Sequence, residues 1–478
     1  MDRTESSTDR NSPEQEIEKP PKVPVEPARP EEADDEVRKI SPKEEEMLRL
    51  NEIVSGLDLF HSKGNAEQAY ARLTIRDKPE IVRIDSRRFR RALTHLYRMK
   101  HGSYPSFSSI KNAVEGAAAK AQFECAGEAV HVRVGEHSDA IYIDLVDSEG
   151  RFIKVVPGKW EIVTECPIRF IRQPGMLPLP IPDRKGNIRL LWECLGLHKS
   201  GRLEQCLIGS WIIQALVPKG PFPLLWVAGP QGAGKTMFCR MVRALIDPNV
   251  SPVRSIAQTE RDLLIAATNS WVVGLDNISN LKDPMSDSMC RLATGAGFSA
   301  RTLFTDADET LIYVKRPQMV NGIDDLALNS DLMDRGLFIT LQPILENERR
   351  TEDDLWKEFD DKAPGMFGGL LDVLCKALWD LPNVKPGRLP RMADFAKLAI
   401  AAEQHMGFER GTFETAFQQN KESSDRLAIE SSASPWQQPS DMIPSCSAPA
   451  VGSSAASCGS AWSGLGSSGS CDSASSPR

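Results

Sequence analysis

The sequence predicts an α/β fold in which helices cover a parallel sheet, with an N-terminal α+β domain, a C-terminal helical subdomain and disordered tails. Two observations near the middle of the chain predict the sheet. An apolar run at residues 224–228 leads through a glycine-rich loop into a helical pattern at 237–246, and a second apolar run at 271–275 ends in Asp276. Further strand-like runs at 317–321 and 337–341 follow helical stretches. Strands that alternate with helices are typical of a parallel, helix-covered sheet.

Five segments are predicted along the chain. Residues 1–48 are acidic and proline-rich, and residues 426–478 are rich in Ser, Gly and Ala. Both are expected to be disordered, because they offer too little apolar surface to offset the entropy of folding. Residues 49–183 combine helical patterns, the first at 45–64, with period-two runs and are interpreted as the α+β domain. Residues 184–350 hold the parallel sheet, and 351–425 form the helical subdomain, with breaks at Pro364 and between Pro382 and Pro390.

Composition limits where the protein works and what it binds. The chain has 478 residues with 58 basic and 66 acidic side chains, a net charge of −8, so any nucleic acid must be bound by a local basic patch. The ten cysteines show no C-x-x-C spacing, which favours reduced thiols in a cytoplasmic protein. We expect no membrane association, because no apolar run reaches about 18 residues.

The glycine-rich loop matches the pattern G-x-x-x-x-G-K-[ST], the phosphate-binding P-loop. Its residues are Gly229, Pro230, Gln231, Gly232, Ala233, Gly234, Lys235 and Thr236. Glycines allow successive backbone N–H groups to face one point, at the positive end of the helix that follows. We therefore expect ATP and Mg²⁺ as cofactors, with Lys235 on the β- and γ-phosphates and Thr236 on the metal.

Polar residues end the next two predicted strands of the sheet. Asp276 and Asn277 follow the run at 271–275, the pattern of a Walker B acid that holds Mg²⁺. Asn321 ends the run at 317–321 and is equally compatible with a turn at the end of a strand. Between them, residues 298–314 read as a β-hairpin around an acidic tip at 305–309.

One predicted helix carries the strongest basic cluster of the chain. It begins after the N-cap residues Asp85 and Ser86 and runs to Met99. Four arginines open it: Arg87, Arg88, Arg90 and Arg91. They are expected either to contact a nucleic acid backbone or to form the solvated face of an amphipathic helix.

The order of these motifs resembles that of the AAA+ ATPases and, within them, the superfamily 3 helicases of viruses and phages. More narrowly, the segments at 227–236, 259–263, 321–323 and 389–395 look like those of ATP-binding proteins of bacterial prophages and mobile elements, some of which follow a primase-like domain. The resemblance covers about residues 49–420. It implies a homo-oligomeric ring that acts in DNA replication on single-stranded or forked DNA, with a primase or another replication protein as partner.

The resemblance also implies roles for single residues. Asp276 would be the Walker B acid, and Asn321 would be sensor 1, which positions the attacking water. Arg335 would be an arginine finger that reaches a neighbouring subunit, although a surface salt bridge to Asp331 or Asp334 is the other reading. Catalytic residues are therefore expected at Lys235, Asp276, Asn277, Asn321 and Arg335.

Two features depart from the family. Many AAA+ enzymes have Glu where this chain has Asn277, and an amide cannot act as the base; Glu260 and Glu309 are alternative bases. The hairpin tip is acidic, and the basic residues Arg301, Lys315 and Arg316 lie at its base rather than at its tip.

The sequence thus favours an ATP-hydrolysing, helicase-like motor of phage or prophage replication. A nucleotide-dependent assembly switch and a P-loop small-molecule kinase are the alternatives.

Overall fold

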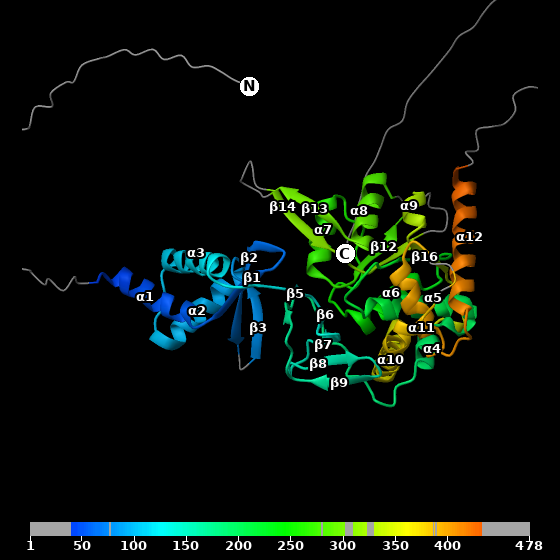
Figure 1. Cartoon of the computed structure of the whole chain (residues 1–478), viewed down its shortest axis with the longest axis horizontal. Coiled ribbons are helices and arrows are strands. Elements are labelled where there is room, and N and C mark those ends of the chain that lie inside the picture. The colour runs from blue at the N-terminus through cyan, green and yellow to red at the C-terminus, as the bar shows by residue number, and fades with distance from the viewer. Residues whose placement is uncertain are drawn as a thin grey trace, which may run out of the picture.

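The computed structural model describes residues 40–75, 78–278, 281–301, 309–322, 329–385, 387 and 390–432. The predicted tails therefore fall almost entirely outside the described residues, and so does the hairpin tip at 305–308. Figure 1 shows an N-terminal body at one end of the long axis, a small antiparallel sheet in the middle and the parallel sheet at the other end. Within the described residues, no helix combines the length and the apolar character needed to cross a membrane.

The N-terminal body packs three helices against a four-stranded sheet of order β3-β2-β1-β4. Its elements are α1 (Pro42–Ser55), β1 (Asp58–Ser62), β2 (Asn65–Ile75), β3 (Lys78–Arg83), α2 (Arg87–His101), α3 (Phe107–Phe123) and β4 (Gly127–Glu128). The expected cap of α2 is confirmed, since the Ser86 side chain accepts a hydrogen bond from the N–H of Phe89. The helix predicted at 45–64 was too long. It ends at Ser55, and the buried residues Leu59 and Phe60 belong to a strand.

A second, antiparallel sheet follows, with strand order β6-β7-β8-β9. Its strands are β6 (Val134–His137), β7 (Ala140–Asp144), β8 (Phe152–Val156) and β9 (Lys159–Val163), and a parallel pair, β5 (Val130–His131) and β10 (Arg169–Phe170), lies beside it. Its buried face shares one hydrophobic core with helix α10 (Glu352–Asp380). Trp160 Nε1 also donates to Asp372 Oδ1 of α10 at 2.7 Å. The predicted domain 49–183 is therefore split, and its second sheet packs with the C-terminal helices.

The parallel sheet has the order β12-β15-β11-β16, and every neighbouring pair is parallel, as predicted. Its strands are β11 (Leu224–Ala228), β12 (Val273–Ile278), β15 (Gln318–Gly322) and β16 (Gly336–Thr340). Side chains of β11 alternate between two cores, with Leu225 and Val227 in one and Leu224 and Trp226 in the other. The two faces are thus both buried, as expected for a parallel sheet covered by helices.

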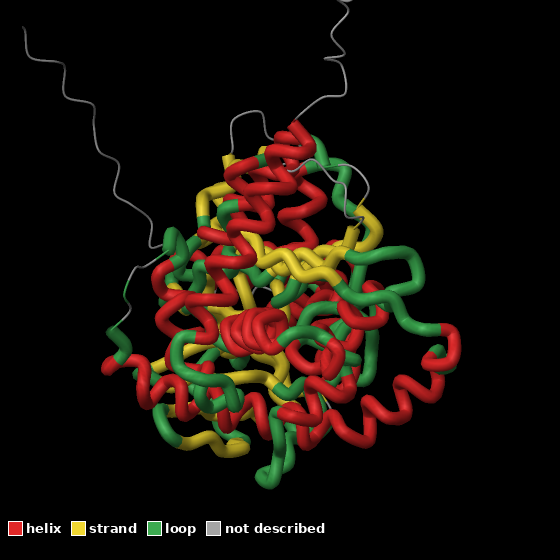
Figure 2. The backbone as a smooth tube through the Cα atoms, turned by 90° about the vertical axis from the view of Figure 1, so that its right-hand side faces the viewer, coloured by secondary structure: helices red, strands yellow, loops and turns green. Residues whose placement is uncertain are grey.

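Helices surround this sheet, as Figure 2 shows in red around the yellow strands. They are α4 (Arg189–Cys194), α5 (Arg202–Ala215), α6 (Lys235–Ile246), α7 (Glu260–Asn269), α8 (Asp283–Thr294), α9 (Ser330–Met333), α10, α11 (Ala393–Glu403) and α12 (Thr412–Ser432), with single 3₁₀ turns η1 (Leu197–Lys199), η2 (Glu346–Glu348) and η3 (Leu381–Asn383). The predicted hairpin is formed by β13 (Ala296–Arg301) and β14 (Glu309–Val314), which pair antiparallel. Helix α12 runs seven residues past the predicted start of the C-terminal tail at 426.

Helix α10 contradicts the predicted break at Pro364, because it continues through that residue for 29 residues in all. The carbonyl groups of Pro364 and Gly365 accept hydrogen bonds from the N–H groups of Asp183 and Asn187 at 2.9 and 3.0 Å. A Cβ added to Gly368 would lie 1.9 Å from the Asp183 carbonyl oxygen. The chain leading into the parallel-sheet domain thus packs directly on the helix backbone beside Pro364.

Candidate functional site

The glycine loop joins β11 to α6 at the carboxyl edge of the sheet. Its backbone is left-handed at Gly229, Gly232 and Gly234, with φ of 139°, 83° and 77°. A Cβ on Gly229 would lie 2.7 Å from the Leu341 carbonyl oxygen, so the site also has no room for a side chain there. The sequence pattern therefore folds into a tight curl ahead of a helix N-terminus, the arrangement that suits a phosphate group.

Lys235 is the first residue of α6 and folds back over the loop. Its Nζ donates to the carbonyl oxygens of Gly229 and Pro230, the second at 3.1 Å. These carbonyl contacts hold the ammonium group at the mouth of the loop. The same group could exchange them for the oxygens of a bound phosphate without moving far.

Thr236 and Asp276 meet across 40 residues of sequence. Thr236 Oγ1 donates to Asp276 Oδ1 at 3.0 Å. Asp276 lies near the end of β12, and its backbone N–H donates to the Arg254 carbonyl at 2.7 Å. A hydroxyl and a carboxylate in contact beside a glycine loop form an oxygen donor set of the kind that Mg²⁺ prefers.

A bulge brings Asn277 and Asn321 together. Leu275 pairs with Val320 and Ile278 with Gly322, so two residues of β12, Asp276 and Asn277, lie opposite the single residue Asn321 of β15. Asn277 consequently takes a left-handed backbone, φ 54°, and its N–H donates to Asn321 Oδ1 at 2.7 Å. The sequence analysis named both side chains but missed this backbone contact, which no sequence pattern signals.

Asn321 is buried, with 2 % of its surface exposed. Its Oδ1 is held by the Asn277 N–H. Below it, burial raises the pKa of the Cys239 thiol to about 12, while a hydrogen bond to the Asn321 side chain acts in the opposite direction. Asn321 is therefore a buried amide that is fixed through its Oδ1, and its Nδ2 has, among the described residues, no partner other than the Cys239 thiol.

Arg335 lies away from the loop in an ion-pair network of its own. It pairs with Asp331, whose carboxylate also lies 2.9 Å from Arg391 Nη1. Asp334 in turn pairs with Lys421 of α12 at 2.6 Å. Burial raises the pKa of Asp331, but the hydrogen bond and charge of Arg335 outweigh it, so that this pKa is lowered. Within one chain the structure thus pairs Arg335 with Asp331 and does not bring it to the glycine loop.

The other predicted residues lie apart from this site. Glu260 is paired with Arg291 at 2.8 Å, and the side chain of Glu309 is outside those described. Arg316 does not belong to a basic surface at the hairpin base. Its Nε donates to the carbonyl groups of Ala267 and Ser270, and burial lowers its pKa to about 10.

The four arginines that open α2, called the α2 arginines below, are all exposed: Arg87, Arg88, Arg90 and Arg91. Arg88 is paired with Glu80, and Arg90 donates to the Asp85 carbonyl. In the described part of the chain, Arg87 and Arg91 form no ion pair. The α2 arginines belong to the N-terminal body, at the opposite end of the molecule from the glycine loop in Figure 1.

Comparison with known proteins finds a family model that matches the central part of the chain. The model of a family described as the actinomycete integrative conjugative element replication protein matches residues 195–418. This region is therefore similar to replication proteins of a mobile element, and the expected resemblance to mobile-element proteins is confirmed. A search of curated proteins finds no match.

Several solved structures resemble the chain at low identity. The apo C-terminal region of NrS-1 has a TM-score of 0.40 and 12% identity over 77% of this chain and 74% of that chain. SCCmec type IV Cch, described as an active helicase, has a TM-score of 0.41 and 13% identity over 79% and 75%. JCV helicase has a TM-score of 0.23 and 14% identity over 50% and 73%. These values are too low to assign an activity to this chain.

Proposed function

We propose that the chain is an ATP-binding and ATP-hydrolysing replication protein of a mobile element that acts on DNA as a helicase-like motor. The observation that carries the nucleotide part is the contact of Thr236 with Asp276 at 3.0 Å beside the glycine loop. The residues present fit Mg²⁺ and ATP, since the loop curls at three glycines and a buried amide donor, Asn321 Nδ2, has no partner other than the Cys239 thiol in the described part of the chain. The family match to residues 195–418 supports the replication part.

Each side chain of the site has a role in this proposal. Mg²⁺–ATP would supply the phosphoanhydride bond that is cleaved. Lys235 would release the two loop carbonyls and neutralise phosphate oxygens, while Thr236 and Asp276 hold the metal and its water shell. Asn321, held by the Asn277 N–H, would donate its Nδ2 to the attacking water or the γ-phosphate. Asn277 cannot take up a proton, so it would only orient water.

Two further parts of the motor belong to the proposal. The exposed α2 arginines would bind the DNA backbone, because guanidinium groups neutralise phosphates without reading sequence. In a homo-oligomeric ring, Arg335 would leave Asp331 and reach the nucleotide of a neighbouring subunit. Its Nε lies buried with no hydrogen-bond partner in the described part of the chain, so its pairing with Asp331 does not satisfy the whole guanidinium.

Equilibrium binding tests the nucleotide part directly. Calorimetric titration with Mg²⁺–ATP should show one site per chain, and Lys235→Ala should weaken it strongly while the protein stays folded. Arg240→Ala is a matched control, since Arg240 lies on the same helix and pairs with Glu352 instead of the loop. Equal binding by folded Lys235→Ala and the unmodified chain would reject the proposal.

A nucleotide-dependent assembly switch is the second candidate. Asn277 favours it, because no carboxylate follows Asp276 to act as a base, and so does the pairing of Arg335 with Asp331. The switch predicts ATP binding and ATP-dependent assembly with turnover that stays negligible in the presence of DNA.

A further inference from the structure

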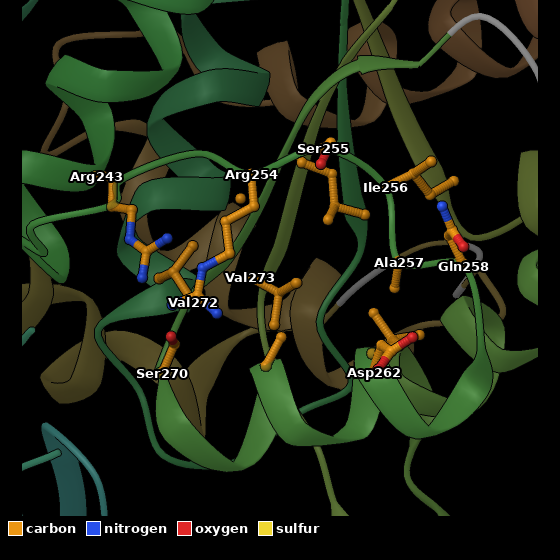
Figure 3. A pocket seen from close by; sticks show the side chains of 14 residues that line it. Arg243, Arg254, Ser255, Ile256, Ala257, Gln258, Asp262, Ser270, Val272 and Val273 are labelled. Atoms are coloured by element: carbon orange, nitrogen blue, oxygen red, sulfur yellow. The ribbon is translucent and has the colours of Figure 1, made fainter. Parts of the chain in front are cut away.

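A cavity separate from the glycine loop lies on the outer side of β12. Its volume is about 350 Å³, and it is bounded by β12, the segment 254–258 and α7. The polar residues that line it are Arg243, Arg254, Ser255, Gln258, Asp262 and Ser270, and apolar side chains of α7 and β12 form the rest of the wall. Figure 3 shows Arg243 and Arg254 on one side of the cavity and Asp262 on the other.

The one carboxylate that is completely buried beside this cavity, among the described residues, already accepts four hydrogen bonds. Asp247 is completely buried and accepts from Arg133 Nε at 3.1 Å and from Arg243 Nη2 at 3.3 Å. It also accepts from the N–H groups of Trp271 and Val272 at 3.1 and 3.0 Å. Three of these four donors bind Oδ2, and Arg133 binds Oδ1, so Arg133 and Arg243 already share the charge of this one carboxylate.

Positive charge is in excess around this carboxylate. Four arginines lie in its neighbourhood: Arg133, Arg243, Arg254 and Arg316. Burial lowers the pKa of Arg243, and the charges of Arg254 and Arg133 lower it further. Arg316 forms no ion pair with any residue that the structure describes, although the charge of Asp247 favours its charged form; its guanidinium lies 5.3 Å from the ring centre of Trp271 and donates to carbonyl groups. Uncompensated guanidinium charge of this kind favours an anion nearby.

Arg254 is the arginine that remains available. Its backbone is fixed, because its N–H donates to the Gly274 carbonyl at 3.0 Å and its carbonyl accepts from Asp276. Its guanidinium has no hydrogen bond or ion pair to any residue that the structure describes. Asp262, on the far wall, accepts instead from the hydroxyl of Thr259 at 2.7 Å, as part of the cap of α7.

We propose that this cavity binds a small organic phosphate, with its phosphate on the guanidinium of Arg254 and its apolar part against α7 and β12. Arginine binds phosphate oxygens through two parallel hydrogen bonds, which suits an open guanidinium at a cavity wall. A cavity whose wall combines apolar side chains with convergent polar groups suits a small molecule that has both a charged and an apolar part. The site is independent of the glycine loop, which follows a different strand.

The proposal is tested by calorimetric titration with phenyl phosphate, a probe that combines a phosphate group with an apolar ring. Phenyl phosphate should bind saturably, more tightly than inorganic phosphate, while benzyl alcohol should not bind. Arg254→Gln should weaken phenyl phosphate at least about tenfold, since a charge-assisted hydrogen bond is lost, and Arg254→Lys should weaken it less. Because the side chain of Arg254 has no partner in the described structure, both variants should fold, which circular dichroism checks.

Two controls separate this site from others. Binding should persist in Lys235→Ala, which changes only the glycine loop, and in Arg261→Gln, which removes an exposed arginine of α7 outside the cavity. The proposal is overturned if phenyl phosphate does not bind, if Arg254→Gln binds it as tightly as the unmodified chain, or if Lys235→Ala abolishes its binding. If phenyl phosphate and inorganic phosphate bind with equal affinity, the proposal that the ligand is an organic phosphate is overturned.

Discussion

Replacing Asn321 with Ala separates its role in the fold from its proposed role in turnover. The substitution removes the acceptor at 2.7 Å from the Asn277 N–H, a loss of about 1 kcal/mol for one partly buried hydrogen bond. It also removes the Nδ2 donor. Loss of one donor that stabilises a transition state typically lowers turnover about 10²–10³-fold, or about 2.7–4 kcal/mol. The expected effect on turnover is therefore larger than the effect on stability.

Gln318→Ala provides the matched control for this substitution. Gln318 is also a completely buried amide on β15 with one satisfied and one unsatisfied atom, as its Nε2 donates to Met289 and its Oε1 has no partner among the described residues. It lies three residues earlier on the strand, about 10 Å from Asn321. Thermal unfolding should show both variants destabilised, and steady-state ATP turnover should fall only in Asn321→Ala. Equal turnover in the two folded variants would refute the role given to Asn321.

Three other predictions follow from the remaining sites. DNA affinity should fall steeply with salt concentration, and replacing all four α2 arginines with Ala should make that salt dependence shallower. If the slope of affinity against salt does not change, the α2 arginines form only the solvated face of the helix. Lys235→Ala and Arg335→Ala should each lose turnover alone, because an arginine finger contributes about 10³–10⁵ in rate to a neighbouring site. Turnover should return when the two variants are mixed before assembly. If the mixtures assemble yet stay inactive, Arg335 has only the role of a salt-bridge partner. Cys206 and Cys239 have pKa values raised to about 12 by burial, so above pH 9 the unfolded chain releases protons that the folded chain keeps. Stability to urea should then fall as pH rises from about 9 to 12, and less so in the Cys206→Ala variant; equal slopes would contradict the buried thiols.

Local signals in the sequence were sufficient to predict the parallel sheet and the glycine loop. An apolar strand, three glycines that need left-handed backbone and a helix are adjacent in the chain, so their pattern is complete without any distant residue. The positions of Asp276 and Asn321 at strand ends followed from the same logic. Parallel strands place their carboxyl ends at one edge, so residues that end them lie close together.

Features that depend on distant partners could not be predicted. Helix α10 passes through Pro364, where the carbonyl groups of Pro364 and Gly365 accept hydrogen bonds from Asp183 and Asn187, which lie about 180 residues earlier in the chain. The bulge at Asp276 and Asn277 results from the register between β12 and β15, and register is set by tertiary packing. The period-two runs noted within residues 49–183 include the strands of the antiparallel sheet, but no sequence pattern signals that this sheet packs on α10.

The rate of ATP turnover with and without single-stranded DNA tests the central claim most directly. Turnover should be measurable for the unmodified chain, should rise with added single-stranded DNA, and should be absent in Lys235→Ala under both conditions. The rise should also disappear at high salt, where the backbone contacts of the α2 arginines are screened. A folded chain that binds ATP but shows no turnover at any DNA concentration would contradict the motor and leave the assembly switch.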